Sequence, residues 1–217
     1  GLRERRLVEQ LSTLFPEAGF IAEEGSGSLT DEEYCWVIDP LDGTTNYSQG
    51  LPIFTVSIGL QCKGETVLGV VYAPYLNELY EACKGKGAML NGRSIHVSGK
   101  NDTQESVVST GFPIDKDRNP DNNLDNLARI LPMVRGVRRQ GSAAFDLCCV
   151  AAGILDGYWE FNLHLWDVCA GILIVTEAGG TVRSFREDRN VSIVAGTPAI
   201  VEQLYPRLSD KPGKICL

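Results

Sequence analysis

Residues 36–47, with the sequence WVIDPLDGTTNY, restrict the fold more than any other part of the chain. Three apolar residues predict a buried strand, and Asp39 and Asp42 then flank Pro40 at a bend. Proline fixes its own φ and favours an extended backbone at the residue before it, so the bend is rigid. Such a bend can direct both carboxylates, and the Leu41 carbonyl between them, toward one point.

Carboxylate and carbonyl oxygens that converge in this way suit Mg²⁺, which prefers hard ligands in octahedral geometry. Gly43, Thr44 and Thr45 follow at once, and threonine is a residue type that starts helices. Backbone N–H groups at a helix start bind anions, and phosphate is a common occupant. The stretch therefore predicts a metal site beside a phosphate site, although a polar turn without chemical function has the same pattern.

Two distant segments carry further acids in apolar surroundings. Residues 20–25 form a short apolar strand that ends in Glu23 and Glu24, and the apolar segment 165–180 has Asp167 near its start. A lone carboxylate on a core helix is costly unless a positive group meets it. We therefore expect four acids to share bound cations: Glu23, Asp39, Asp42 and Asp167.

These motifs resemble those of the inositol monophosphatase family of Mg²⁺-dependent phosphatases. The resemblance extends from Leu7 to Leu208. The matching blocks, in the family's order, are Glu23-Glu24, residues 36–47, 139–144 and 156–160, and Trp166-Asp167 with residues 177–180. Several separated motifs in register are far more specific than one short pattern.

The resemblance implies a role for each matching residue. It implies a metal site made by Glu23, Asp39, the Leu41 carbonyl, Asp42 and Asp167. It implies catalytic roles for Glu23 and Thr44. It implies substrate contacts from Asp42, Gly43, Thr44, Thr45, Gly141, Ser142, Ala143, Glu160 and Asp167, with Glu160 accepting from inositol hydroxyls. For Glu160 the alternative is a solvated acid at a strand end, and for Ala143 it is plain helix packing.

The reaction implied by the resemblance is Mg²⁺-dependent hydrolysis of a phosphate monoester, with inositol monophosphate as the expected substrate and lithium as an inhibitor. In the related bisphosphate nucleotidases a lysine commonly follows the Gly-Thr, and histidinol phosphatases often carry Arg-Ser there. Thr44-Thr45-Asn46-Tyr47 instead matches the inositol monophosphatases. The alternatives are a broad-specificity sugar phosphatase acting on fructose 1,6-bisphosphate, a nucleotide bisphosphate phosphatase, and a non-catalytic metal- or phosphate-binding scaffold subunit.

Composition narrows the class of protein and its partners. Hydrophobic residues make up 43% of the chain and charged residues 22%, as in soluble globular proteins. The net charge of −8 argues against a nucleic-acid-binding surface. Seven cysteines without C-x-x-C spacing fall mostly in apolar runs, which predicts buried reduced thiols, with Cys148 and Cys149 on a helix. We expect a cytoplasmic protein with no membrane partner, and the family implies a homodimer.

Neither histidine lies in a recognisable nucleophile motif. His164, two residues before Trp166, could be a ligand, but we favour a hydrogen-bonded structural histidine. His96 follows a predicted hairpin and has no expected role.

Apolar periodicity predicts an opening helix with Leu7, Val8, Leu11, Leu14 and Phe15 on one face, which Pro16 ends. Hairpins are expected at Lys63-Gly64 and Asn91-Gly92, so the first half reads as largely antiparallel sheet. In the second half, strands and helices alternate, and Ser142 is expected to cap a helix. The predicted strands span residues 20–25, 36–38, 54–61, 66–73, 78–83, 88–90, 94–97, 106–110, 137–139, 158–161, 181–184 and 191–195.

The predicted fold class is α/β (α+β), and the resemblance implies a layered α-β-α-β-α sandwich. We expect one domain over residues 1–217, with sub-lobes at roughly 1–110 and 111–217. In the family, a further helix and a short Asp-x-Val-Thr-like segment precede the first helix, and the acid of that segment pairs with the threonine equivalent to Thr44. No matching acid is present from Gly1 onward, so we expect a longer native protein.

Overall fold

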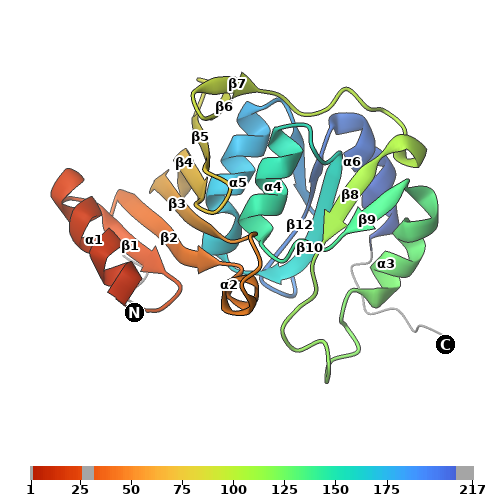
Figure 1. Cartoon of the computed structure of the whole chain (residues 1–217), viewed down its shortest axis with the longest axis horizontal. Coiled ribbons are helices and arrows are strands. Elements are labelled where there is room, and N and C mark those ends of the chain that lie inside the picture. The colour runs from red at the N-terminus through yellow and green to blue at the C-terminus, as the bar shows by residue number, and fades with distance from the viewer. Residues whose placement is uncertain (1, 26–31, 209–217) are drawn as a thin grey trace.

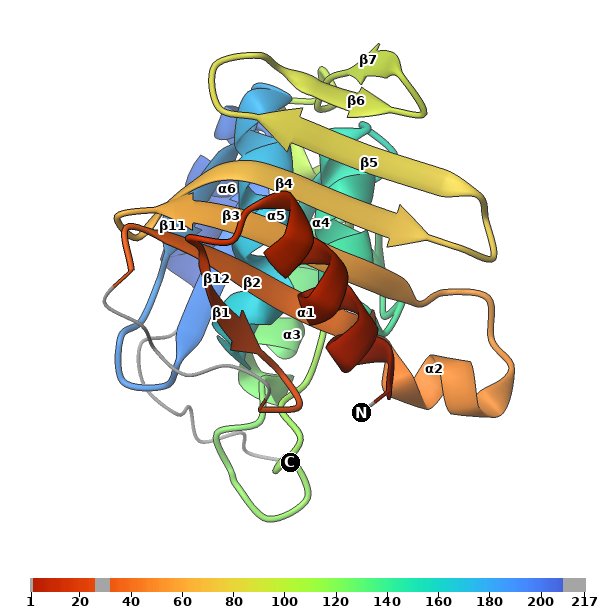
Figure 2. The same ribbon diagram turned by 90° about the vertical axis from the view of Figure 1, so that its left-hand side faces the viewer.

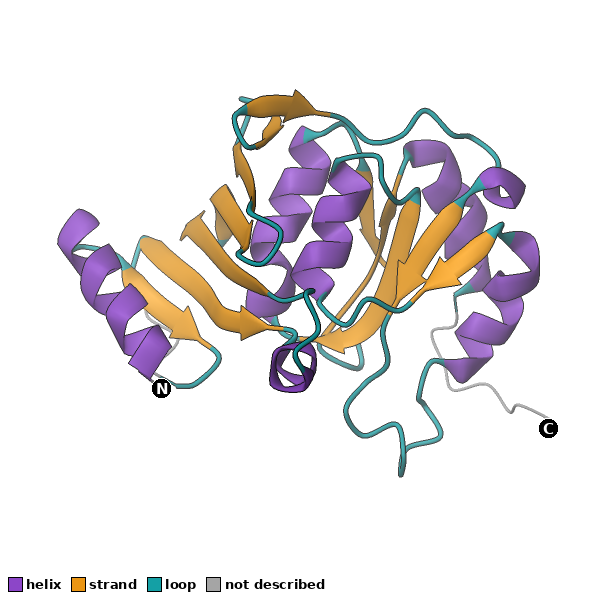
Figure 3. Ribbon diagram, viewed as in Figure 1, coloured by secondary structure: helices purple, strands orange, loops and turns teal. Residues whose placement is uncertain are grey.

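A computed structural model describes residues 2–25 and 32–208, and it shows five alternating layers (Figure 1, Figure 3). Helix α1 covers the outer face of the first sheet, α4 and α5 lie between the two sheets, and α3 and α6 cover the second sheet. The described helices are α1 (Leu2–Leu14), α2 (Thr44–Gln49), α3 (Leu124–Ile130), α4 (Ala143–Ala151), α5 (Leu165–Glu177) and α6 (Pro198–Leu204). The fold is therefore α/β, and the expected α-β-α-β-α layering is confirmed.

The first sheet has seven strands in sequence order. They are β1 (Gly19–Ala22), β2 (Tyr34–Asp42), β3 (Thr55–Cys62), β4 (Glu65–Ala73), β5 (Glu78–Cys83), β6 (Ala88–Leu90) and β7 (Arg93–Ile95). Among the described pairs of this sheet, only β1–β2 is parallel. Both expected hairpin turns are confirmed, with positive φ at Lys63, Gly64, Asn91 and Gly92, as two-residue turns require.

The opening helix is confirmed, and Figure 2 shows it crossing the outer face of the first sheet. Leu11 of α1 packs with Trp36 and Ile38 of β2 in a small apolar cluster. Glu4 is fully buried at the start of this helix, and its carboxylate accepts a hydrogen bond from the Glu24 N–H at 2.7 Å. Helix α1 thus contacts the segment that carries Glu23.

The second sheet has the order β11-β12-β10-β8-β9. Its strands are β8 (Val107–Thr110), β9 (Gly136–Arg138), β10 (Gly157–Leu163), β11 (Thr181–Ser184) and β12 (Val191–Gly196). Every strand predicted from the sequence is present, and the ends differ by up to four residues. We expected the second sub-lobe to begin after Thr110. The second sheet begins earlier in the chain, with β8 at Val107. The division into a single domain with two sub-lobes stays a prediction.

The central helices are almost wholly apolar because they are covered on both sides. All nine residues of α4 are buried, and Ser142 caps the helix by accepting from the Phe145 N–H, as predicted. Glycines in β3 and β4 let α5 approach the first sheet closely. A Cβ atom at Gly69 would lie 2.8 Å from the Ala170 carbonyl oxygen and 3.0 Å from its Cα. The distance between this helix and the sheet therefore depends on Gly69.

We expect Gly69→Ala to lower the free energy of unfolding by about 1–3 kcal/mol, because the added methyl group meets helix backbone that cannot move alone. Urea unfolding measures the change. Gly99→Ala is the matched control, since a Cβ atom there has no atom within 4 Å. Equal stability of the two variants would show that α5 can shift to make room.

The cysteine prediction holds for four of the six cysteines that the structure describes. Cys35, Cys148, Cys149 and Cys169 are buried, but Cys62 is half-buried and Cys83 is exposed, because both lie at the ends of strands. All six are free thiols, and Cys148 and Cys149 lie on α4 as predicted. The seventh, Cys216, lies outside the described residues. Within residues 2–25 and 32–208, no helix is long and apolar enough to cross a membrane.

Candidate active site

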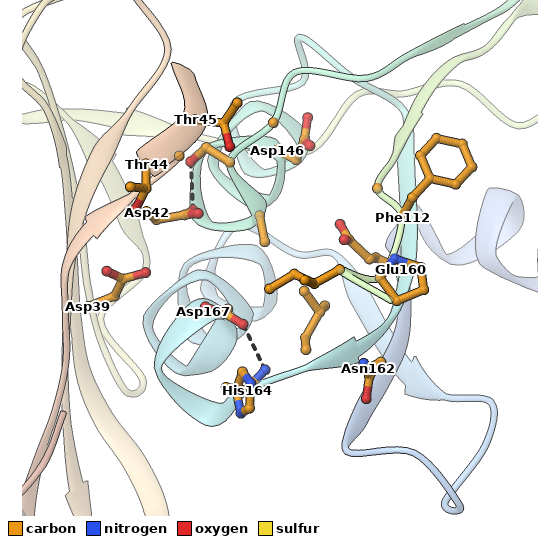
Figure 4. A pocket seen from close by; sticks show the side chains of 18 of the residues that line it. Asp39, Asp42, Thr44, Thr45, Phe112, Asp146, Glu160, Asn162, His164 and Asp167 are labelled. Carbon is orange, nitrogen blue, oxygen red and sulfur yellow. Dashed lines mark hydrogen bonds between the residues drawn. The ribbon is translucent and has the colours of Figure 1, made fainter. Parts of the chain in front are cut away.

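A pocket of about 420 Å³ lies where the two sheets and three helix starts meet (Figure 4). Helices α2, α4 and α5 all begin at its wall, and β2 and β10 pass beside it. The structure brings every residue expected at the site to this pocket. They are Glu23, Asp39, Leu41, Asp42, Gly43, Thr44, Thr45, Gly141, Ser142, Ala143, Glu160 and Asp167.

A bulge in β2 turns Asp39 and Asp42 toward the same pocket. Asp39 pairs with Ser57 and Asp42 with Thr55, so β2 has one more residue than β3 between these pairs. Residues three apart on a regular strand point to opposite faces, and the extra residue restores a common direction. From the sequence we expected the strand to end at Ile38 and a turn to follow it. That prediction is wrong, because β2 continues to Asp42 through the bulge.

Hydrogen bonds hold the bulge in shape. Asp39 Oδ1 accepts from the Leu41 N–H at 2.8 Å, and Thr44 Oγ1 donates to the Leu41 carbonyl at 3.0 Å. Thr44 is the first residue of α2, and the N-cap is Gly43 with φ of 87°. A Cβ atom at Gly43 would lie 3.0 Å from the Ile53 carbonyl oxygen, so both the backbone conformation and the space favour glycine.

Asp42 and Asp167 are held by the starts of the two central helices. Asp42 Oδ2 accepts from Ser142 Oγ at 2.6 Å and from the Ala144 N–H at 2.8 Å. Asp167 lies in the first turn of α5, and its Oδ2 accepts from the His164 N–H at 2.7 Å (Figure 4). The positive ends of both helices stabilise these carboxylates. In both acids, Oδ2 accepts these hydrogen bonds from the described part of the chain. The other oxygen, Oδ1, is left to bind a cation.

Burial and neighbouring negative charges oppose the ionisation of three acids of the metal-type site, Asp39, Asp42 and Asp167. Burial raises the pKa of Asp39 to about 9, and the charges of Asp42 and Glu23 add to the effect. Burial raises the pKa of Asp42 to about 7, and the charges of Asp167 and Glu23 oppose its ionisation. Burial and the charge of Glu23 raise the pKa of Asp167 to about 6. A positive ion between them would remove this cost.

The acids fit Mg²⁺ by their chemistry, since all the donors are hard oxygens. As the side chains stand, no three His, Cys, Asp or Glu residues in the part of the chain that the structure describes converge closely enough to enclose an ion. Closure around a cation therefore requires these carboxylates to move closer together. The shared pocket, the Oδ1 atoms of Asp42 and Asp167 and the mutual repulsion are the observations that support a cation there.

Glu160 forms the opposite wall from the middle of β10. Tyr158 donates its hydroxyl to Glu160 Oε2 at 2.7 Å, and burial raises the pKa of Glu160 to about 8. A Cβ atom at Gly111 would lie 2.1 Å from the Glu160 carboxylate, so this glycine provides the space for it. The alternative of a solvated acid at a strand end is wrong, because β10 continues to Leu163.

Several pocket residues were not foreseen from the sequence. Asp146 of α4 is buried beside Gln140, which donates to it at 2.7 Å, and burial raises its pKa to about 7. The reasoning that found Asp167, a lone acid on an apolar helix, could have found Asp146 as well. Arg139 and the loop residues Phe112 and Lys116 also line the pocket. Arg139 begins the matching block 139–144 but was given no role there, and no local pattern marks the two loop residues.

His164 lines the pocket and is the N-cap of α5, where its backbone N–H donates to Asp167 Oδ2 and its carbonyl accepts from the Asp167 N–H at 3.2 Å. Its ring stacks on Trp166 at 4.6 Å between centroids. These contacts agree with the structural histidine favoured from the sequence. His96 is exposed after β7 and does not line this pocket.

A layered α/β fold with acids and helix starts around one pocket is the arrangement of a phosphatase-type protein. Residues 2–211 match the sequence profile of the inositol monophosphatase family, and the chain belongs to this family. The resemblance read from the motifs is thereby confirmed.

Individual relatives carry two kinds of name. The chain is 42% identical to the Nus factor SuhB of Pasteurella multocida, over 96% of this chain and 81% of that protein. It is also 42% identical to the inositol-1-monophosphatase of Mesorhizobium japonicum, over 91% of this chain and 76% of that protein. Among solved structures, the inositol monophosphatase from Anabaena (Nostoc) sp. PCC 7120 superimposes with a TM-score of 0.89 and 40% identity, over 94% of this chain and 83% of that chain.

Proposed function

We propose that this protein hydrolyses a phosphate monoester in a Mg²⁺-dependent reaction, with inositol monophosphate as its substrate. The observation that carries the proposal is one pocket with two chemically different ends. Four mutually repelling carboxylates and the start of α2 lie at one end, and the half-buried Glu160 lies at the other. The first end suits a phosphate with a cation, and the second suits the hydroxyl groups of a polyol.

We assign the cation to Glu23, Asp39, the Leu41 carbonyl, Asp42 and Asp167. When bound, Mg²⁺ would neutralise the phosphoryl oxygens and activate water for attack. The backbone N–H groups of Gly43, Thr44 and Thr45 would hold the phosphate. A six-residue helix is a weak anion site by itself, and the acids of the same pocket are the independent support.

The remaining steps fall to side chains of this chain. Because Thr44 Oγ1 already donates to the Leu41 carbonyl, its lone pairs are available to accept from and orient the attacking water. We assign Glu23 the acceptance of a proton from that water. Glu160, with the wall of Gly141, Ser142 and Ala143, would bind the hydroxyl groups of the alcohol portion. Lithium inhibition, a homodimeric state and a cytoplasmic location remain expectations from the resemblance.

A second candidate is a binding role without catalysis, favoured by the name Nus factor that a relative at 42% identity carries. The expectation that the chain has no nucleic-acid partner rests on its net charge of −8 and stays a prediction. Phosphate release from a panel of phosphomonoesters, with Mg²⁺ and with a chelator, separates the two candidates. Mg²⁺-dependent release that is fastest with inositol monophosphate supports hydrolysis, and no release from any ester overturns it.

We expect Glu160→Gln to raise the KM for inositol monophosphate about tenfold and to leave the KM for a small aryl phosphate nearly unchanged. A hydrogen bond to a charged group contributes roughly 1.5–3 kcal/mol, and the amide removes that charge. Rates should be compared above pH 8, because the pKa of Glu160 lies at about 8 and the carboxylate is ionised there.

Glu105→Gln, an exposed acid outside the pocket, is the control for this comparison. Equal losses with both esters would show that Glu160 supports the fold or the cation instead of the polyol.

A further inference from the structure

Behind the Glu160 wall, two arginines join segments that are far apart in sequence. Arg186 and Arg189 lie in the turn between β11 and β12, and Asp115 and Asp121 lie in the loop between β8 and α3. Arg186 binds Asp121 with both guanidinium branches at 2.9 Å, and Arg189 binds both carboxylate oxygens of Asp115 at 3.0 Å. These four residues are here called the clamp.

The central arginine of the clamp, Arg186, is buried, and each of its three guanidinium nitrogens donates a hydrogen bond. The Arg186 side chain is 2% exposed, and Asp188 accepts from its Nε and Nη2 at 2.7 and 2.8 Å. Arg189 also donates to the Asp121 carbonyl at 2.9 Å. Two-point pairs between a planar guanidinium and a carboxylate restrict orientation as well as distance, which lysine cannot do. The clamp therefore defines where the loop lies.

That loop forms part of the pocket wall. Three of its residues line the pocket: Phe112, Ile114 and Lys116. Phe112 and Ile114 come just before Asp115, and Lys116 lies between Asp115 and Asp121. Pro113 is buried, but from Ile114 to Arg118 the loop is exposed or half-buried, and Ile114 itself is 88% exposed. In Figure 1 the loop extends from the end of β8 below the second sheet before it returns to α3. Ion pairs attach this loop to the β11–β12 turn.

The same turn also supports the residues next to Glu160. The guanidinium carbons of Arg186 and Arg189 lie 4.9 and 5.6 Å from the centre of the Phe161 ring. Asn190 donates to the Asn162 side chain at 2.9 Å, where β10 has an irregular register and Asn162 a φ of 63°. Phe161 and Asn162 both line the pocket. One turn thus contacts both halves of the wall around Glu160.

We propose that Arg186 and Arg189 are positioning residues that hold the loop 111–122 and the Phe161–Asn162 wall in place, and so determine which alcohol portion of the ester the pocket accepts. Neither arginine lines the pocket, so the effect is transmitted through the wall. The selectivity part of this inference rests on the proposed phosphatase function, whereas the positioning part does not.

Arg186→Lys keeps the charge and removes the two-point pair. We expect it to raise the KM for inositol monophosphate about tenfold while the kcat and KM for a small aryl phosphate stay within about twofold, because misplacement of the wall affects only an alcohol that touches it. Arg183→Lys is the matched control on the adjoining strand, where Arg183 pairs with the exposed Glu202. Asp115→Asn, which removes the charge that pairs with Arg189 and leaves the Arg186–Asp121 pair in place, is the second variant if Arg186→Lys folds poorly. It also alters the hydrogen bond that Asp115 accepts from Asn119.

Limited trypsin digestion tests the positioning without any substrate, since the loop contains Lys116 and Arg118. Cleavage after these residues should become several-fold faster in Arg186→Lys and Asp115→Asn than in Arg183→Lys. Unchanged cleavage overturns the positioning role. Faster cleavage with equal losses on both esters overturns the selectivity role. If the parent protein hydrolyses no ester, the proposed function fails, and the digestion alone decides whether the clamp holds the loop.

Discussion

Asp39→Asn, Asp42→Asn and Asp167→Asn should each reduce Mg²⁺-dependent phosphate release by about 10²–10³-fold or more. Changes to residues that merely support metal ligands commonly cost 10–100-fold, and loss of a ligand charge should cost more. Each amide keeps the size of the side chain, so the effect reports the charge. Initial rates over a range of Mg²⁺ concentrations measure it, and a raised Mg²⁺ requirement should accompany the loss.

Asp117→Asn is the control, because Asp117 is exposed on the loop and does not line the pocket. Asp42→Asn should also perturb Ser142 and the start of α4, since Asp42 accepts two hydrogen bonds there. Thermal unfolding of each variant separates this effect from loss of the cation. Near-normal rates in all three variants would remove the metal site from the proposal.

Without Mg²⁺, the melting temperature should fall as the pH rises from about 5 to about 9, and Mg²⁺ should restore it most at the alkaline end. Folding raises the pKa of Asp39 to about 9, of Asp42 to about 7 and of Asp167 to about 6. A group whose pKa is raised by folding stabilises the folded state below its unfolded pKa and loses that contribution as the pH passes its folded pKa. A pKa that differs by one between the folded and unfolded states corresponds to about 1.4 kcal/mol, so the summed change should be several kcal/mol.

Asp146 and Glu160 have raised pKa values in the same range and act in the same direction. Bound Mg²⁺ replaces the protons only at the acids that hold it, and its affinity rises with pH as those acids ionise. Thermal scans with chelator, with Mg²⁺ and with sodium at matched ionic strength distinguish binding from charge screening. A melting temperature that rises with pH in chelator, or an equal Mg²⁺ effect at both ends of the range, would contradict the prediction.

The local chemistry of the sequence was enough for most of the elements. Asn91-Gly92 adopts the two positive φ angles that a tight hairpin needs, and Ser142 offers a hydroxyl to a free helix N–H, so neither depends on distant parts of the chain. The acids of the pocket were also visible, because a carboxylate within an apolar run is costly without a partner. That criterion applies to Asp39 and Asp167 wherever the fold carries them.

The tertiary structure decided what lies between those acids and around them. The bulge that gives Asp39 and Asp42 a common direction is a property of the pairing of β2 with β3, and the sequence of β2 alone predicted a turn. Arg186 and Asp121 are 65 residues apart, and each lies in a polar segment that resembles any solvated loop. Their pairing requires the β8–α3 loop and the β11–β12 turn to meet at the same end of the second sheet. Such a meeting is set by the packing of whole layers, and no local pattern of residues encodes it.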